Sequence, residues 1–166
     1  MGWLANRTVR LVGESRVIAA AIEAQGGSVV ADGACDALVH VAEASLSLPA
    51  HEISHANWRQ TLDAGLDQRF LLAREFATTR RSVGAGGAIV FVGAPEQVCG
   101  SDHAAAAGAL GNLTKTLGVE WARDGIRVNT VLTSAECATL GNLVAYLLSD
   151  FAAYVTGAVT GVGLDD

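Results

Sequence analysis

Two stretches decide the fold class: GGAIVFVGA at residues 86–94 and SDHAAAAGALGNLTKTLGVEWARDGIRVNTV at residues 101–131. Together they predict an apolar strand (Ala88 to Val92), a long helix (Ser101 to Arg123) whose apolar residues return every three or four positions, and a second apolar strand (Ile126 to Leu132). A strand, a helix and a strand in this order, with continuously apolar strands, are typical of a parallel sheet covered by helices on both faces.

The same alternation extends in both directions along the chain. Further strands are predicted at Thr8 to Val12, Ser28 to Ala31, Ala37 to Ala42 and Ala158 to Val162, and further helices at Ser15 to Gln25, about Ser54 to Arg81, and Leu140 to Ser149. Right-handed crossovers make a Rossmann-like doubly wound α/β fold the expected architecture, with about six mostly parallel strands in one domain over residues 1–166.

One connection is too short for an ordinary parallel crossover. Only Asp32 to Asp36 separates two predicted strands, whereas a crossover normally needs a dozen or more residues. Either an extended segment runs back across the sheet, or Ser28 to Ala31 pairs in another way. A strand and helix that are usual in this architecture are expected to be missing here.

Composition excludes several classes of protein. The 166 residues are 51% hydrophobic and 17% charged with a mean hydropathy of +0.35, which excludes a disordered or fibrous chain. The net charge is −6 and the basic residues are scattered, so a nucleic-acid partner is not expected. No apolar run is long enough for a membrane span, which predicts a cytoplasmic protein without a membrane partner. Cys35, Cys99 and Cys137 are expected to be small buried thiols in a reducing compartment.

Five segments in order resemble the short-chain dehydrogenase/reductase family. They are the two stretches quoted above together with CDALVHVAEAS (35–45), NWRQTLDAGLDQRFLLAREF (57–76) and LVAYLLSDFAAYVTGAVTGVGLDD (143–166). The likeness covers most of the chain. Compared with that family, the chain is expected to lack the third strand and helix unit and the substrate lid, since Val131 to Ala138 lead almost directly to Leu140.

The resemblance implies hydride transfer between NAD(P) and a carbonyl or alcohol carbon, which needs a tyrosine, a lysine, a serine and an asparagine. The matching positions here are His103, Ala107, Gly93 or Ala94, and Gly65. No shift of the alignment restores the Tyr-x-x-x-Lys pair, because the single lysine is Lys115 and Gly111 lies four residues before it. The sequence therefore predicts no catalytic residue, with proton exchange by His103 as an alternative.

The cofactor segments also differ from the family's pattern. The family's turn Thr-Gly-x-x-x-Gly-x-Gly is reduced to Gly13, Glu14 and Ser15, and Glu14 adds an anion where a phosphate would lie. The family's Asn-Asn-Ala-Gly stretch is replaced by residues 40–43, His-Val-Ala-Glu. No cofactor is therefore predicted. A second match, Thr156 to Gly163, spells the glycine turn but is expected to form the last strand.

His51, Glu52 and His55 spell the zinc motif His-Glu-x-x-His, and Glu75 lies twenty residues after His55. The motif binds zinc only when both histidines lie on one helical face. Ser54 is a natural N-cap, so His51 and Glu52 are expected in the preceding loop and no metal is predicted. A zinc hydrolase nevertheless stays an alternative.

Small residues return along the Ser101 to Arg123 helix, which suggests that another backbone approaches it closely, either from this chain's own sheet or from a second subunit. In the family, the two long helices form a four-helix bundle with a neighbour, and the closing strand makes a second contact. The resemblance thus implies interface positions at Trp58, Leu62, Leu66, Phe70, Ala104, Gly108, Gly111, Lys115, Gly118, Thr156 and Gly157.

The leading hypothesis is a non-catalytic pseudo-dehydrogenase subunit that assembles with an active short-chain dehydrogenase partner in a heterotetramer. One resembling assembly acts on a hydroxyacyl-CoA. The alternatives are a homodimeric module that binds a small ligand or an acyl thioester, and an enzyme that works through His103 or through the zinc motif.

Overall fold

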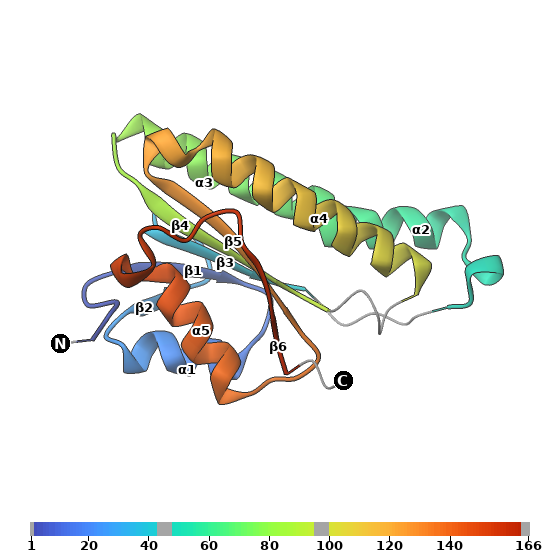
Figure 1. Ribbon diagram of the computed structural model, residues 1–166, viewed down its shortest axis with the longest axis horizontal. Coiled ribbons are helices and arrows are strands. Elements are labelled where there is room, and N and C mark those ends of the chain that lie inside the picture. The colour runs from blue at the N-terminus through green and yellow to red at the C-terminus, as the bar shows by residue number, and fades with distance from the viewer. Residues whose placement is uncertain (1, 43–47, 95–99, 164–166) are drawn as a thin grey trace.

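A six-stranded parallel sheet forms the centre of the fold (Figure 1). The structure is a computed structural model that describes residues 2–42, 48–94 and 100–163. The strands lie in the order β2, β1, β3, β4, β5, β6, and each neighbouring pair is parallel. Their bounds are Thr8–Val12 (β1), Ser28–Val30 (β2), Ala37–Val41 (β3), Gly87–Gly93 (β4), Ile126–Thr133 (β5) and Val159–Val162 (β6). The predicted Rossmann-like α/β fold is confirmed.

Helices cover both faces of the sheet (Figure 1). On one face lie α1 (Arg16–Ala24) and α5 (Ala138–Leu148), and on the other lie α3 (Gln68–Ser82) and α4 (Ser101–Glu120). The shorter α2 (His55–Leu62) contacts α4 and extends beyond the end of the sheet. The helices predicted from apolar spacing are thus present, with ends shifted by a few residues.

Strand β4 shows why its sequence is continuously apolar. Ala88, Val90 and Val92 belong to the core between the sheet and the α1–α5 layer. Ile89 and Phe91 belong to the core beneath α3 and α4. Because successive side chains of a strand point to opposite faces, a strand covered on both sides buries every residue.

The short connection between β2 and β3 runs back across β1. β2 pairs with one edge of β1 and β3 with the other, and Val30 lies level with Arg10 while Ala37 lies level with Val9. The chain therefore has to return by about one residue and to move sideways by two strand spacings, about 10 Å. Residues 31–36 are enough for that distance because β2 is only three residues long.

The predicted helix over Ser54 to Arg81 is interrupted. Ser54 caps α2 by accepting a hydrogen bond from the Asn57 main-chain N–H at 3.1 Å, as predicted. A π-helical turn at Asp63–Asp67 then separates α2 from α3. Turns of this wider kind occur frequently at functional sites.

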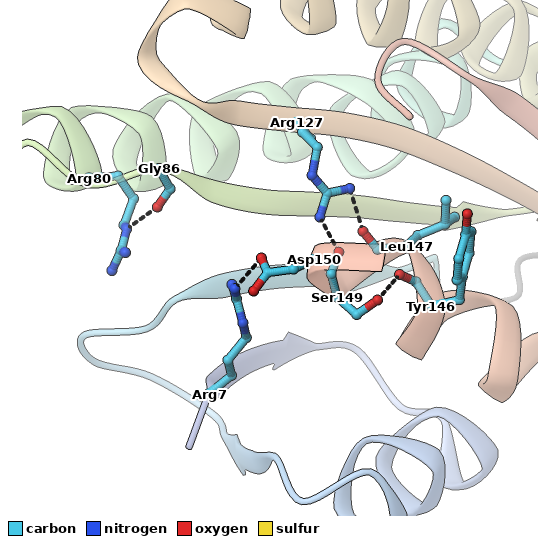
Figure 2. Close-up of polar contacts among 8 residues, drawn as sticks. All are labelled: Arg7, Arg80, Gly86, Arg127, Tyr146, Leu147, Ser149 and Asp150. Carbon is cyan, nitrogen blue, oxygen red and sulfur yellow. Dashed lines mark hydrogen bonds and ion pairs between the residues drawn. The ribbon is translucent and has the colours of Figure 1, made fainter. Parts of the chain in front are cut away.

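Helix α5 is tied at its carboxyl end to the sheet (Figure 2). The guanidinium of Arg127 on β5 donates to the main-chain oxygens of Leu147 at 2.6 Å and Ser149 at 2.9 Å. These oxygens lie at a helix end, where carbonyls lack partners within the helix and a cation is favoured. Residues 134–137 alone connect β5 with α5.

Two of the three cysteines can be placed. Cys35 and Cys137 are free thiols that are half-buried, so the prediction of fully buried thiols is wrong for both. The reason is that each lies in a connection, between β2 and β3 or just before α5, and not in the core. Cys99 lies outside the described residues.

Among the helices in the described ranges, none has the length and hydropathy to cross a bilayer.

Candidate functional site

A pocket of about 470 Å³ lies at the carboxyl ends of β1 and β3. From these two neighbouring strands the chain continues to opposite faces of the sheet, to α1 and to α2, and ligands bind at this switch point in open α/β sheets. We call it the β1–β3 pocket, and its lining residues come from the strand ends, α2, the π-helical turn and α3: Val12, Gly13, His40, Val41, Ala56, Arg59, Gln60, Asp63, Ala64 and Gln68.

A buried arginine lies next to this pocket. Arg69 is 2% exposed and His40 is 5% exposed. Arg69 Nε donates to His40 Nδ1 at 3.2 Å, and its Nη2 donates to the Val92 main-chain oxygen at 2.8 Å. The guanidinium carbon also lies 6.0 Å from the centre of the Phe91 ring. A cation is thus fixed where β3 and β4 end.

Burial and charge determine the protonation of this pair. Burial lowers the pKa of His40 to about 4, and the positive charge of Arg69 lowers it further in the same direction. Burial also lowers the pKa of Arg69 to about 10. At neutral pH, Arg69 is therefore charged and His40 is neutral, which suits His40 to binding and not to proton exchange.

The turn between β1 and α1 does not fit a dinucleotide pyrophosphate. β1 ends at Val12 and α1 begins at Arg16, so the turn consists of Gly13, Glu14 and Ser15. Gly13 has φ of +86°, and a side chain there would lie 2.3 Å from the Val41 main-chain oxygen, so this glycine serves the protein's own packing. The Ser15 hydroxyl accepts the Ile18 N–H at 3.3 Å, a group that a bound phosphate would use.

The positions that match the family's catalytic residues lie near the same ends of the strands. Gly65 is in the π-helical turn, where an added Cβ would meet the Ala106 Cβ at 3.0 Å. Gly93 ends β4, where an added Cβ would meet Arg69 Nη1 at 3.3 Å, and Ala94 is exposed just after it. The Arg69 guanidinium therefore occupies space beside the position that matches the serine.

The other two matching positions lie on α4. His103 and Ala107 are half-buried and one helical turn apart, in the first half of the helix. Lys115 lies two turns beyond Ala107 and is exposed. The lysine therefore does not stand at the position where the family's acid–base pair requires it.

The zinc motif does not adopt the geometry that zinc requires. His51 and Glu52 lie in a 3₁₀ turn, Ala50–Glu52, whereas His55 is the first residue of α2. The two histidines thus do not share a helical face. Within the described ranges, no group of three or more histidine, cysteine or acidic side chains is arranged to hold a metal ion.

Some of the implied interface positions contact one another within the chain. Gly118 on α4 is buried against the segment before β6, where an added Cβ would lie 2.6 Å from the Gly157 nitrogen and 2.9 Å from the Thr156 hydroxyl. At Gly111 the nearest atom is Val159 Cγ2 at 3.8 Å. Part of the small-residue stripe is thus explained by this chain's own sheet.

The remaining implied positions lie along α2, the π-helical turn, α3 and α4. Phe70 and Lys115 are exposed, and the others are half-buried: Trp58, Leu62, Leu66, Ala104 and Gly108.

Arg69 is the residue of the site that the sequence reasoning missed. A signal was present, because Leu66, Arg69, Ala73 and Phe76 follow one another at spacings of three and four. An arginine on an otherwise apolar helical face predicts a buried guanidinium with polar partners inside the protein.

Comparison with known proteins establishes the family. The family model described as Enoyl-(Acyl carrier protein) reductase matches residues 12–135. The (2S)-[(R)-hydroxy(phenyl)methyl]succinyl-CoA dehydrogenase subunit BbsC of Thauera aromatica is 32% identical over 180 residues, which cover 90% of this chain and 71% of that protein. The chain belongs to the short-chain dehydrogenase/reductase family of oxidoreductases.

A further relative and a solved structure are also similar to this chain. Cis-4-hydroxycyclohexanecarboxylate dehydrogenase of Sinomonas cyclohexanicum is 31% identical over 162 residues, which cover 78% of this chain but 65% of that protein. The solved structure of a short-chain dehydrogenase from Leptospira borgpetersenii with bound NAD+ has a TM-score of 0.83 at 15% identity, covering 96% of this chain and 92% of that one, and so shares the fold. The chain spans about half to two thirds of the length of the curated relatives it matches first.

Proposed function

We propose that this chain is a degenerate, shortened member of its family that acts as a non-catalytic subunit in a cytoplasmic assembly with an active short-chain dehydrogenase. The observation that carries the proposal is the residue set at the matching positions: Gly65, Gly93, His103 and Ala107 supply neither the tyrosine–lysine pair nor the serine and asparagine. The three-residue turn after β1 supports the same conclusion for the cofactor.

Internal connections support the shortened character. Residues 31–36 replace the unit of a strand and a helix expected between β2 and β3, and residues 134–137 replace the expected lid between β5 and α5. Without a lid, a substrate at the strand ends would stay open to water. The elements to which the resemblance assigns the contacts between subunits, α2, α3, α4 and β6, are all formed, which supports the proposed assembly.

A relative supports the role of a subunit. The Thauera protein is by its name one subunit of a dehydrogenase for an acyl-CoA substrate. In an assembly of the kind proposed, this chain would cover the helix pair of the active partner, burying on the order of 1,000 Å² or more for each contact. The partner would contain the Tyr-x-x-x-Lys pair and the glycine-rich turn, and a heterotetramer acting on a hydroxyacyl-CoA is the expected form.

Co-expression tests this function. The chain is produced together with a family member encoded beside it that has the full catalytic set, and native mass spectrometry gives the stoichiometry. We expect a complex with a fixed ratio of subunits, lost in Phe70→Glu and retained in the control Val83→Glu, which changes an exposed apolar residue at the far end of α3. A stable monomer that does not assemble, or a purified chain that oxidises NADH by itself, would overturn the proposal.

The β1–β3 pocket favours a second function, a homodimeric module that binds a small ligand or an acyl thioester. The pocket has a volume of about 470 Å³, within the range of small-molecule sites, and its lining combines aliphatic and polar residues. The test is the melting temperature of the purified chain in the presence of small ligands and without any partner. If acids, amides and thioesters all leave the melting temperature unchanged, this function is excluded.

A further inference from the structure

Arg69 differs from two other poorly exposed arginines, Arg10 and Arg80, in the chemistry of its partners. Arg10 pairs with Glu75 at 3.0 Å and Arg80 pairs with Asp36 at 3.1 Å. Arg69 is more deeply buried, yet its partners are an imidazole, a main-chain oxygen and an aromatic ring, and no carboxylate in the described part of the chain forms an ion pair with it. A buried cation surrounded by neutral groups favours an anion nearby.

His40 connects this charge to the β1–β3 pocket. His40 lines the pocket, and its Nδ1 accepts the hydrogen bond from Arg69 Nε. A neutral imidazole that accepts at Nδ1 has its proton on Nε2. The ring thus offers a ligand one hydrogen-bond donor, and the guanidinium behind it makes the interaction with a negative acceptor stronger.

The other lining residues are partly aliphatic and partly polar. Four of them are aliphatic, from β1, β3, α2 and the π-helical turn: Val12, Val41, Ala56 and Ala64. Arg59 adds no net positive charge, since its Nη2 pairs with two carboxylates, Asp63 at 2.7 Å and Asp67 at 3.2 Å. Gln60 and Gln68 add amide groups that can donate to a second oxygen. Arg69 is thus the arginine at this site for which the described part of the chain offers no carboxylate partner.

We infer that the β1–β3 pocket binds a monocarboxylate with an apolar body, whose carboxylate accepts the Nε2 proton of His40 and balances the charge of Arg69. This inference rests on the second function above and names its class of ligand. A pyrophosphate would bring more negative charge than one arginine balances, and it would lie beside Glu14.

Calorimetric titration of the purified chain with hexanoate and with its neutral analogue hexanamide tests the inference. We expect hexanoate to bind about tenfold or more tightly than hexanamide, because a charge-assisted hydrogen bond is roughly twice as strong as a neutral one. Arg69→Met should raise the Kd for hexanoate about tenfold or more. The control Arg123→Gln should change it by less than about threefold, because Arg123 is exposed on the 3₁₀ turn Ala122–Asp124 and does not line the pocket.

A second measurement covers the case in which Arg69→Met does not fold. ¹⁵N spectra of the wild-type chain should show His40 as the neutral tautomer protonated at Nε2, with ring signals that shift as hexanoate is added. Equal binding of the acid and the amide, or unchanged His40 signals in millimolar hexanoate, would overturn the inference. The neutral thioester S-hexanoyl-N-acetylcysteamine separates the two ideas: if it binds while hexanoate does not, only the inference fails, and if neither binds, the second function fails too.

Discussion

Arg127 on β5 donates a hydrogen bond of 2.9 Å to the main-chain oxygen of Ser149, the residue directly after α5. The next residue, Asp150, forms an ion pair with Arg7, which precedes β1 (Figure 2). Two arginines from opposite halves of the chain therefore hold one helix end. This end sets the position of the segment that leads into β6.

Arg127→Met should lower the free energy of unfolding by about 2 to 4 kcal/mol, because it removes charge-assisted hydrogen bonds to the main-chain oxygens of Leu147 and Ser149 at the end of α5. Urea unfolding followed by circular dichroism measures the change. Arg123→Met is the control, since Arg123 is exposed on the 3₁₀ turn Ala122–Asp124 and should change stability by less than about 0.5 kcal/mol. Equal effects of the two variants would contradict the assigned role.

His40 should make the fold sensitive to acid. Its pKa is lowered from 6.5 to about 4 in the folded chain, so between these values the unfolded chain binds a proton that the folded chain does not. Stability is therefore complete above about pH 6.5 and is lost as the pH falls toward 4, by about 3 kcal/mol at most. Unfolding measured at several pH values should show a weaker dependence in His40→Asn. His51→Asn, which changes an exposed histidine, should retain the dependence of the wild type.

Two glycines of α4 should respond in opposite directions to alanine. Gly118→Ala places a Cβ against the Gly157 backbone and should lower the free energy of unfolding by about 2 to 3 kcal/mol, although alanine has a better helix propensity than glycine. Gly111→Ala has 3.8 Å to its nearest neighbour and should gain up to about 1 kcal/mol. Thermal unfolding measures both. If Gly118→Ala is as stable as the wild type, the segment before β6 does not pack tightly against α4 at Gly118.

Gly93 and Arg69 should be energetically coupled. Gly93→Ser brings a Cβ to 3.3 Å from Arg69 Nη1, a group that two hydrogen bonds hold in place, and should cost about 1 to 2 kcal/mol. Gly93→Ser should lower the free energy of unfolding by less in the Arg69→Ala background than in the wild type. A double-mutant cycle in urea measures the coupling. A serine that costs the same in both backgrounds would show that the guanidinium does not limit this position.

Restoring the family's residues tests the proposed loss of catalysis. The variant Gly65→Asn, Gly93→Ser, His103→Tyr and Ala107→Lys should still not oxidise NADH when a carbonyl compound is supplied as the hydride acceptor, because the turn Gly13 to Ser15 is unchanged and Arg69 is still in place. Absorbance at the nicotinamide band follows the reaction, and fluorescence titration follows cofactor binding. Turnover by this variant would show that the three-residue turn can hold the cofactor.

The sequence was sufficient for most of the sheet because its strands are apolar on both faces, and a continuous apolar run such as Ala88 to Val92 has few other structures available to it. It did not predict the π-helical turn at Asp63–Asp67, because one extra residue in a turn leaves the spacing of apolar residues almost unchanged. The pairing of His40 with Arg69 was also missed. These residues are far apart in the chain, and only the parallel arrangement of β3 beside β4, with α3 above them, brings them together.

The contact between Arg69 and Gly93 also bears on how this lineage can change. A serine that arises at position 93 meets the guanidinium. Loss of the guanidinium removes the Arg69 donor from His40 Nδ1 and leaves the Val92 oxygen with the Ala42 N–H at 3.0 Å. Either change made first therefore lowers stability. The contact thus hinders the stepwise appearance of a serine at position 93, because the path through single mutations passes a less stable chain whichever change comes first.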